Sequence, residues 1–363
     1  MKFSCFFFSA NDSYSNNERY KFILEAARFL DESEFEAIWT PERHFQEFGG
    51  CFPSPAVLSA GIATTTRNLK IRAGSVVVPH YHPVQIAEQW ALVDQLSNGR
   101  VGLCYASGWH KRDFVFYPDN YESRKEVMYS GIDTVQRLFN RELVSFNGGA
   151  EQIEVKTFPE PVQQSIPGWL VMSSDFSVCK QAGRRGMNLL LMLNDWQQLT
   201  SAIQVYRQSR AEAGLDPEQG VVTIAIHTYI AEDNEKAEEV VQQPLKQYLQ
   251  TFLKARTDDK GLSGDQPPIT AEEQEMILSS ALQDLIDNRA MIGNQAKCLT
   301  MVERLKDVGV NEIACLVDFG VNFSTVMASL KRLAALKDKF NETEEKVSEE
   351  SSPDASFHWY FNR

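Results

Sequence analysis

Residues 71–105 read IRAGSVVVPHYHPVQIAEQWALVDQLSNGRVGLCY and contain the unit that decides the fold. Ile71–Val78 is a short apolar run of the kind that forms a buried strand, and Val101–Tyr105 is a second one. Between them, Val84–Leu96 has the apolar spacing of an amphipathic helix. A strand, a helix and a strand in this order predict a parallel βαβ unit.

The same alternation continues in both directions from this unit. Six further apolar runs predict strands: Phe3–Ser9, Ala37–Thr40, Trp169–Ser173, Leu189–Leu193, Thr223–Ile230 and Glu312–Val317. Helical patterns lie between the strands: Asn17–Leu30, Ala56–Thr65, Arg124–Leu138, Ser177–Arg185, Leu199–Ala213, Lys236–Lys254 and Ala296–Val308. Eight strands alternating with helices predict an α/β fold, a (β/α)8 TIM barrel over residues 1–340.

Three segments exceed what a plain barrel needs. Residues 143–156, with Asn147-Gly148-Gly149 at the turn, predict a hairpin before the fifth strand. Residues 255–292 predict a lid-like insertion with a helix from about Ala271 to Ile286. The acidic tail at 341–363, which contains ETEEKVSEESSPD, is predicted to be disordered.

Composition excludes several classes of protein. The net charge of −13 argues against a nucleic-acid binder, because phosphate contacts require a basic surface. No apolar run reaches the ~18 residues of a membrane span, and no cleavage-like site follows the apolar opening. The six cysteines have no CxxC spacing, which is typical of reduced thiols in a cytoplasmic protein.

The chemistry of such a barrel lies on the loops after the strands. The loop after the second strand begins Pro41-Glu42-Arg43-His44, and His44 is suited to proton transfer with Glu42 orienting it. A surface salt-bridge cluster beside a structural histidine would contain the same residues. The loop after the fourth strand, Ala106-Ser107-Gly108-Trp109, would admit a planar ligand, or is an ordinary turn ending on a core tryptophan.

Two other groups of residues are ambiguous. Ser173 to Ser177 precedes a helix and would bind a phosphate, although N-capping by Ser174 or Asp175 explains the same letters. His80-Tyr81-His82 has an H-x-H spacing, but no third ligand or HExxH pattern accompanies it, so we expect no metal.

Taken together, these segments resemble the luciferase-like monooxygenases, and most of all the FMN-dependent subgroup found in polyketide and nonribosomal peptide gene clusters. The resemblance covers residues 3–338. It is carried by an ordered set of segments: Trp39–Phe45, Ala73–Val77, His82-Pro83 with Glu88, Asn98–Val101, Ala106–His110, Asp113-Phe114 and Gly309–Gly320.

The resemblance implies reduced FMN at the barrel mouth, where O2 would form a C4a-hydroperoxide that oxygenates a small organic substrate. His44 would be the catalytic histidine, with Glu42 beside it, and the chain near Gly74 would pass behind the flavin ring, often through a cis peptide. The implied flavin-binding residues are Ala73, Gly74, Ser75, Ala106, Ser107, Trp109, Tyr121, Ser173, Ser174 and Ser177.

The resemblance also implies partners. A separate reductase would supply reduced FMN, and the substrate would be an acyl or aminoacyl group held by a carrier protein. The basic pairs Lys111-Arg112 and Arg124-Lys125 are the candidate docking residues for an acidic carrier, and a homodimer is expected. Two alternatives stay open: a deazaflavin-dependent oxidoreductase, and a non-catalytic flavin-binding or scaffold homologue.

Overall fold

The computed structural model describes residues 1–8, 14–45, 50–172, 174–260 and 271–351. Its centre is a parallel barrel, closed because the last strand of the sheet also pairs with β9. The barrel strands are β1 (Lys2–Phe6), β2 (Ala37–Thr40), β3 (Lys70–Val77), β4 (Val101–Ala106), β7 (Gly168–Val171), β8 (Asn188–Met192), β9 (Val222–Ile230) and β11 (Glu312–Leu316). All eight strands predicted from the sequence are confirmed, and so is the (β/α)8 fold.

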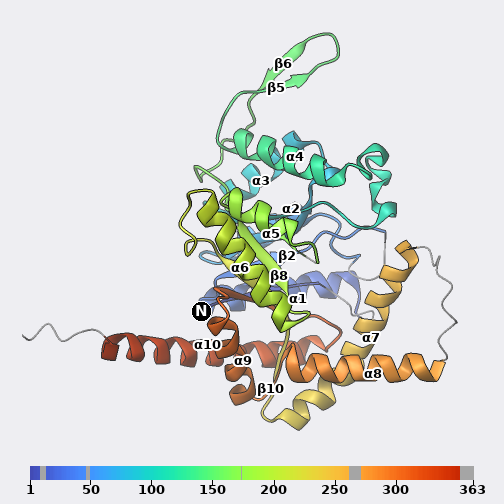
Figure 1. The fold of residues 1–363 in the computed structure, drawn as a ribbon, viewed down its shortest axis with the longest axis vertical. Helices are drawn as coiled ribbons and strands as arrows, with labels where there is room; N and C mark the ends of the chain where they lie inside the picture. The colour runs from blue at the N-terminus through green and yellow to red at the C-terminus, as the bar shows by residue number, and fades with distance from the viewer. Residues whose placement is uncertain (9–13, 46–49, 173, 261–270, 352–363) are drawn as a thin grey trace, which may run out of the picture.

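Helices cover the outside of the barrel (Figure 1). They are α1 (Asn16–Glu32), α2 (Pro55–Thr65), α3 (Pro83–Ser97), α4 (Arg124–Phe139), α5 (Ser177–Arg184), α6 (Trp196–Glu212), α7 (Asn234–Lys260), α8 (Ala271–Asn288), α9 (Gln295–Asp307) and α10 (Phe323–Ser351). Side-chain caps fix several starts: Ser15 forms a capping box with Glu18, and Asn294 accepts a hydrogen bond from the Lys297 N–H.

Side chains alternate between two cores, as the period of a strand requires. Those pointing outward join the large cluster shared with the helices, whereas those pointing inward form a smaller cluster containing Phe6, Trp39 and Trp169. Arg72 lies in this interior, with its guanidinium carbon 4.9 and 4.5 Å from the Trp39 and Trp169 rings. Glu312 neutralises Arg72 at 2.5 Å, so the barrel is a packed core rather than a pore.

Two insertions were expected. The hairpin is confirmed as β5 (Val144–Asn147) and β6 (Gln152–Val155), and it stands away from the barrel (Figure 1). The helix of the 255–292 segment is confirmed as α8, which packs against α7, whereas the loop at 261–270 lies outside the described residues. The same segment also contains β10 (Met291–Gly293), a strand that extends the pairing of β9 and was not predicted.

The prediction of a disordered tail is wrong for its first part. α10 continues to Ser351, so the acidic stretch from Glu342 onward is helical, and residues 352–363 lie outside the described residues. Glutamate and lysine are good helix formers, and the apolar side of α10 packs on the barrel through Phe340. Glu344 also forms an ion pair with Lys306 of α9, which anchors the extension.

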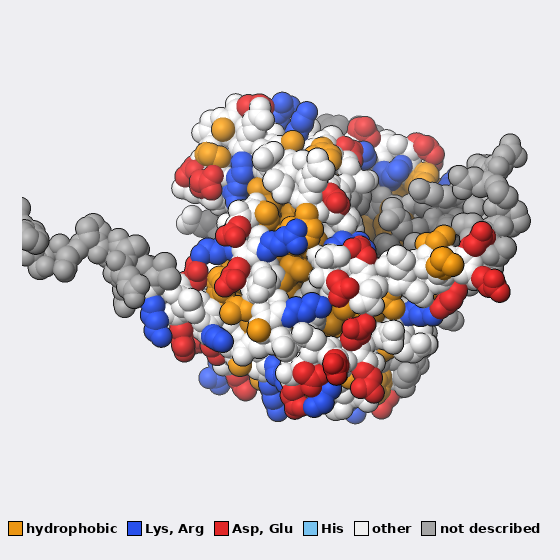
Figure 2. All heavy atoms as spheres, turned by 60° about the horizontal axis from the view of Figure 1, so that its bottom comes forward, with side chains coloured by type: hydrophobic (Ala, Val, Ile, Leu, Met, Phe, Trp, Pro, Cys, Tyr) orange, Lys and Arg blue, Asp and Glu red, His pale blue; other side chains and the backbone are white. Residues whose placement is uncertain are grey.

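None of the helices in these ranges is both long and apolar enough to cross a membrane. On the face shown in Figure 2, acidic and basic side chains are interspersed. Much of the net charge of −13 comes from the acidic C-terminal stretch that begins at Glu342.

Candidate active site

The carboxyl ends of β2, β3 and β4 form one side of the barrel rim. Thr40 at the end of β2 pairs with Ala73, and Val77 at the end of β3 pairs with Ala106 of β4. Because parallel neighbours end at the same edge, the loops that follow these three strands lie together. The histidine loop and the small-residue loop therefore lie at the same edge of the barrel, on either side of the end of β3.

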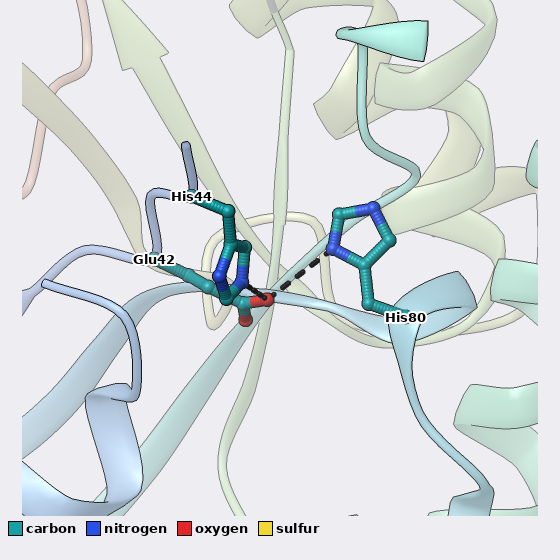
Figure 3. A group of neighbouring side chains, drawn as sticks. All are labelled: Glu42, His44 and His80. Carbon is teal, nitrogen blue, oxygen red and sulfur yellow. Dashed lines mark hydrogen bonds and ion pairs between the residues drawn. The ribbon is translucent and has the colours of Figure 1, made fainter. Parts of the chain in front are cut away.

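Glu42 is the centre of the polar cluster on this side of the rim (Figure 3). Its Oε1 lies 3.0 Å from His44 Nε2 and 3.4 Å from His80 Nδ1, and its side chain is fully buried. The other oxygen, Oε2, accepts a hydrogen bond from the Val77 N–H at 3.0 Å. The carboxylate thus joins the loops after β2 and β3.

These contacts decide which histidine nitrogens carry protons. A carboxylate only accepts hydrogen bonds, so His44 Nε2 and His80 Nδ1 donate, and in the neutral form of His44 the lone pair is on Nδ1. The Tyr81 hydroxyl also interacts with Glu42: burial raises the pKa of Tyr81, and the neighbouring carboxylate raises it further. Glu42 therefore sets both the orientation and the tautomer of His44.

The turn at 106–108 packs beside Phe114, which contacts His80, and a second ring, Phe116, contacts both histidines. Gly108 has φ +78°, and a Cβ there would lie 3.0 Å from both Phe114 Cζ and Val77 Cγ1. The Phe114 ring packs edge-on against His80 at 4.9 Å between ring centroids, and the Phe116 ring lies 4.9 Å from His44. The turn, the two histidines and these rings form one continuous wall.

Two of the predicted aromatic residues lie beside cations. Trp109 is 40% exposed, and the Arg43 guanidinium carbon lies 5.7 Å from its ring and 4.3 Å from the Phe8 ring. Tyr121 packs edge-on against Phe114 at 5.1 Å. The Tyr121 ring also has Arg124 at 4.7 Å and Lys111 at 5.6 Å, so basic side chains gather at this part of the rim.

Three predicted flavin-binding residues, Ala73, Gly74 and Ser75, lie in β3. Ala73 and Gly74 are on opposite faces of the barrel wall. Ala73 is fully buried in the cluster shared with the helices, so it exposes no surface to a ligand. Gly74 faces the interior, where a Cβ would lie 2.6 Å from the Phe6 ring, and Ser75 is half-buried. The peptide bond between Gly74 and Ser75 is cis, as the resemblance implies.

The predicted phosphate site lies at the start of α5. Ser173 is outside the described residues, and the side chains of Ser174 and Ser177 are exposed. Asp175 Oδ1 accepts a hydrogen bond from the Ser177 N–H at 2.8 Å, and Oδ2 pairs with Lys125 at 2.8 Å. Lys125 and Ser177 lower the pKa of Asp175 to about 2. Phe176 is the N-cap of α5 and makes no side-chain cap, so the N-capping alternative by Ser174 or Asp175 is wrong. The Asp175 carboxylate instead accepts from the Ser177 N–H, one of the donors that a phosphate would use.

Several buried polar atoms of the rim have no hydrogen-bond partner among the described residues. They are His80 Nε2, Asp113 Oδ1 and His227 Nε2. Ala225 points into the barrel, and His227 is two positions further along the same strand, so His227 also points inward. It pairs with Leu316 at the end of β11, which places it near the ends of the strands. Unpaired buried polar atoms are costly, and a heterocycle with carbonyl and ring N–H groups would satisfy them.

His80 is the main residue that sequence reasoning missed. The H-x-H pattern placed it with His82, but His82 caps α3 and its ring packs on Phe146, whereas His80 turns toward Glu42. Only the pairing of β2 with β3 brings His80 and His44 together, so no local spacing could have revealed this group.

Asp195 and Trp196 at the end of β8 have structural contacts: Asp195 caps α6, and the Trp196 indole donates to the Asn288 carbonyl.

The chain is similar to known proteins along most of its length. The chain is 24% identical over 342 residues to the oxygenase component of the flavin-dependent trigonelline monooxygenase of Acinetobacter baylyi, covering 92% of this chain and 93% of that one. Monooxygenase RslO1 from Streptomyces bottropensis has the same fold (TM-score 0.79, 21% identity, 92% and 98% coverage).

A second structure with this fold is the oxygenating constituent of 3,6-diketocamphane monooxygenase from Pseudomonas putida, in complex with FMN (TM-score 0.73, 16% identity, 93% and 98% coverage). The family model of the luciferase-like monooxygenases matches residues 1–312. The chain therefore belongs to the luciferase-like monooxygenase family.

Proposed function

We propose that this protein is the oxygenase of a two-component monooxygenase, which uses reduced FMN and O2 to oxygenate a small organic substrate. The observation that carries the proposal is the wall formed by the Glu42–His44 pair and the turn at Ala106–Gly108. A group that moves protons and a surface that accepts a planar ring lie on the same side of the barrel rim. Family membership supports the flavin chemistry.

The residues at the rim fit a flavin ring. Ala106, Ser107 and Ser75 are half-exposed and small, which leaves the backbone accessible to a flat ligand. The unpaired His227 Nε2 and Asp113 Oδ1 offer hydrogen bonds to the polar edge of such a ring. Trp109 and Tyr121 would flank the ring, and Ser173, Ser174 and Ser177 would hold the phosphate. When bound, reduced FMN supplies the two electrons that activate O2.

His44 would hold or transfer a proton through Nδ1. Glu42 keeps the proton of the ring on Nε2, so the lone pair of Nδ1 is free to accept a proton at the reacting centre. Glu42 would also stabilise the imidazolium that results. Phe116 and Phe45 pack on the His44 ring and limit the access of water to it.

The substrate would be an acyl or aminoacyl group tethered to a carrier protein in secondary metabolism. Carrier proteins are acidic, and Lys111 and Arg124, both beside the Tyr121 ring, supply positive charge at the rim. A Lys111→Glu/Arg124→Glu variant should lose turnover of carrier-bound substrates and keep turnover of free thioester analogues. Equal turnover of carrier-bound substrates would exclude docking at these residues.

The oxygenase would work with a separate flavin reductase and as a cytoplasmic homodimer. One of the relatives is itself named an oxygenase component, which supports a separate reductase. Apolar side chains on the outer surfaces of α2 and α3, among them Val57 and Leu92, are 73% and 51% exposed and would be covered by pairing. Sedimentation analysis of the purified protein tests the dimer, and a monomer would exclude it.

The decisive test compares His44→Ala with the wild type and with His82→Asn. His82 lies outside the cluster, and asparagine retains a side-chain cap for α3. We expect His44→Ala to bind FMN as the wild type does and to lose about 10²-fold in product formation, with His82→Asn unchanged. Normal turnover by His44→Ala would remove His44 from the mechanism.

Two outcomes would favour the other hypotheses. Tight binding and reduction of a deazaflavin, with no binding of FMN, would indicate a hydride-transfer enzyme. The protein could instead bind reduced FMN without oxidising any substrate, with the bound flavin reoxidising in oxygenated buffer as fast as free flavin. That result would indicate a non-catalytic flavin-binding or scaffold protein. A stopped-flow absorbance trace with each cofactor distinguishes these outcomes.

A further inference from the structure

The Glu42 cluster has the composition and spacing of a transition-metal site. Glu42 Oε1, His44 Nε2 and His80 Nδ1 all lie within 4.8 Å of one another (Figure 3). We propose that these three atoms bind a divalent transition metal such as Zn²⁺, and that the bound metal switches off the proton transfer assigned to His44. The metal site stands on the geometry alone, whereas the inhibition also depends on the proposed function.

The ligand distances agree with tetrahedral coordination. Bonds of ~2.1 Å from one metal place neighbouring ligand atoms about 3.4 Å apart. The two distances from Glu42 Oε1 are 3.0 Å to His44 Nε2 and 3.4 Å to His80 Nδ1. A metal would therefore replace the two N–H protons between these atoms with shifts of a few tenths of an ångström along these two pairs. The two histidine nitrogens lie within 4.8 Å of each other and would come to about 3.4 Å in the same geometry. Two imidazoles and one carboxylate also form a donor set that suits Zn²⁺ and leaves a coordination position open.

The surroundings hold the ligands in place. The Val77 N–H bond to Glu42 Oε2 fixes the carboxylate, and the side chains of Glu42 and His80 are 0% and 2% exposed. His44 is 9% exposed, so an ion would enter from the His44 side. His80 Nε2 has no partner among the described residues, and Asp113, whose buried Oδ1 also lacks one, interacts electrostatically with both histidines. A carboxylate beside a metal-bound imidazole is a common outer partner of such sites.

Metal binding would reverse the tautomer that His44 needs. When Nε2 gives its lone pair to a metal, the ring proton must move to Nδ1. Nδ1 then donates and no longer accepts, so His44 cannot take a proton from the reacting centre. Glu42 would thus have two roles: it accepts the Nε2 proton of His44 when no metal is bound, and it is a metal ligand in the inhibited state.

The test measures metal binding without flavin. Chelator-treated protein is titrated with Zn²⁺ by calorimetry, and with Co²⁺ while the visible d–d absorption is recorded. We expect the wild type to bind one equivalent with a micromolar or lower Kd and a tetrahedral Co²⁺ spectrum. His80→Asn should bind at least about tenfold more weakly and lose the spectrum, and His82→Asn should match the wild type.

Glu42→Gln is a second variant in case His80→Asn does not fold, and thermal unfolding confirms that each variant is folded. Absence of a saturable equivalent in the wild type, or unchanged binding in both cluster variants, would overturn the site. Saturating Zn²⁺ should also abolish FMN-dependent oxygenation by the wild type, with recovery after addition of EDTA. Full turnover with the metal bound would overturn the inhibition, whereas a protein that binds Zn²⁺ but has no oxygenase activity would refute only the proposed function.

Discussion

Gly108→Ala tests whether the turn at 106–108 is held as tightly as the structure indicates. Gly108 has φ +78°, a region in which a side chain costs about 1 kcal/mol. Its new Cβ would lie 3.0 Å from Phe114 Cζ and from Val77 Cγ1, so one of these neighbours must move. Overpacking of this kind costs about 1–3 kcal/mol, which gives a total loss of about 2–4 kcal/mol in the free energy of unfolding.

Gly214→Ala is the matched control. Gly214 has φ +74°, and no atom outside its chain neighbours lies within 4 Å of its Cβ position. Its substitution should therefore cost only the ~1 kcal/mol of the left-handed backbone. The difference between the two variants, measured by urea unfolding, isolates the crowding by Phe114 and Val77.

The same variants report on cofactor binding. Displacement of the turn and of Phe114, which packs on His80, should weaken FMN binding by about tenfold, or about 1.4 kcal/mol. Gly214→Ala should leave FMN binding unchanged in a fluorescence titration. Equal stability losses in the two variants would refute the crowding, and unchanged FMN affinity in Gly108→Ala would refute the placement of the ring against the turn.

Two further predictions concern charged groups. Burial, with a contribution from Arg289, lowers the pKa of His227 to about 4 from 6.5, so the folded protein binds fewer protons than the unfolded chain between these pH values. The free energy of unfolding should fall by about 2 kcal/mol from pH 7 to pH 5, and urea unfolding of His227→Gln should lack this part of the loss. Asp175→Asn should bind FMN about 2–5-fold more tightly, because a carboxylate near the phosphate is removed, and should bind riboflavin, which has no phosphate, as the wild type does. Equal FMN affinities would place the phosphate away from α5.

The barrel could be predicted because each strand carries its own signal. Short apolar runs such as Val101–Tyr105 bounded by turn residues read as strands wherever they occur, and their alternation with helices leaves few other folds. Elements without a local signal were missed. β10 is only three residues long, and the helical extension of α10 reads by composition as an acidic tail.

The site shows the same division between local and long-range information. His44 and Glu42 are two residues apart, so their pairing could be predicted from one loop. His80 reaches the same carboxylate from a position 38 residues away, through strand pairing that no local pattern contains. The sequence suggested Ser174 or Asp175 as the helix cap, whereas Phe176 is the N-cap and the Asp175 carboxylate accepts from the Ser177 N–H.

A crystal structure of the protein with FMN bound would test the central claim most directly. We predict that the flavin ring lies against the backbone of Ala106–Gly108, with the reactive edge within hydrogen-bonding reach of His44 Nδ1. A ring bound elsewhere on the molecule, or the turn and His44 on opposite sides of a rim filled by protein, would contradict the proposed monooxygenase mechanism.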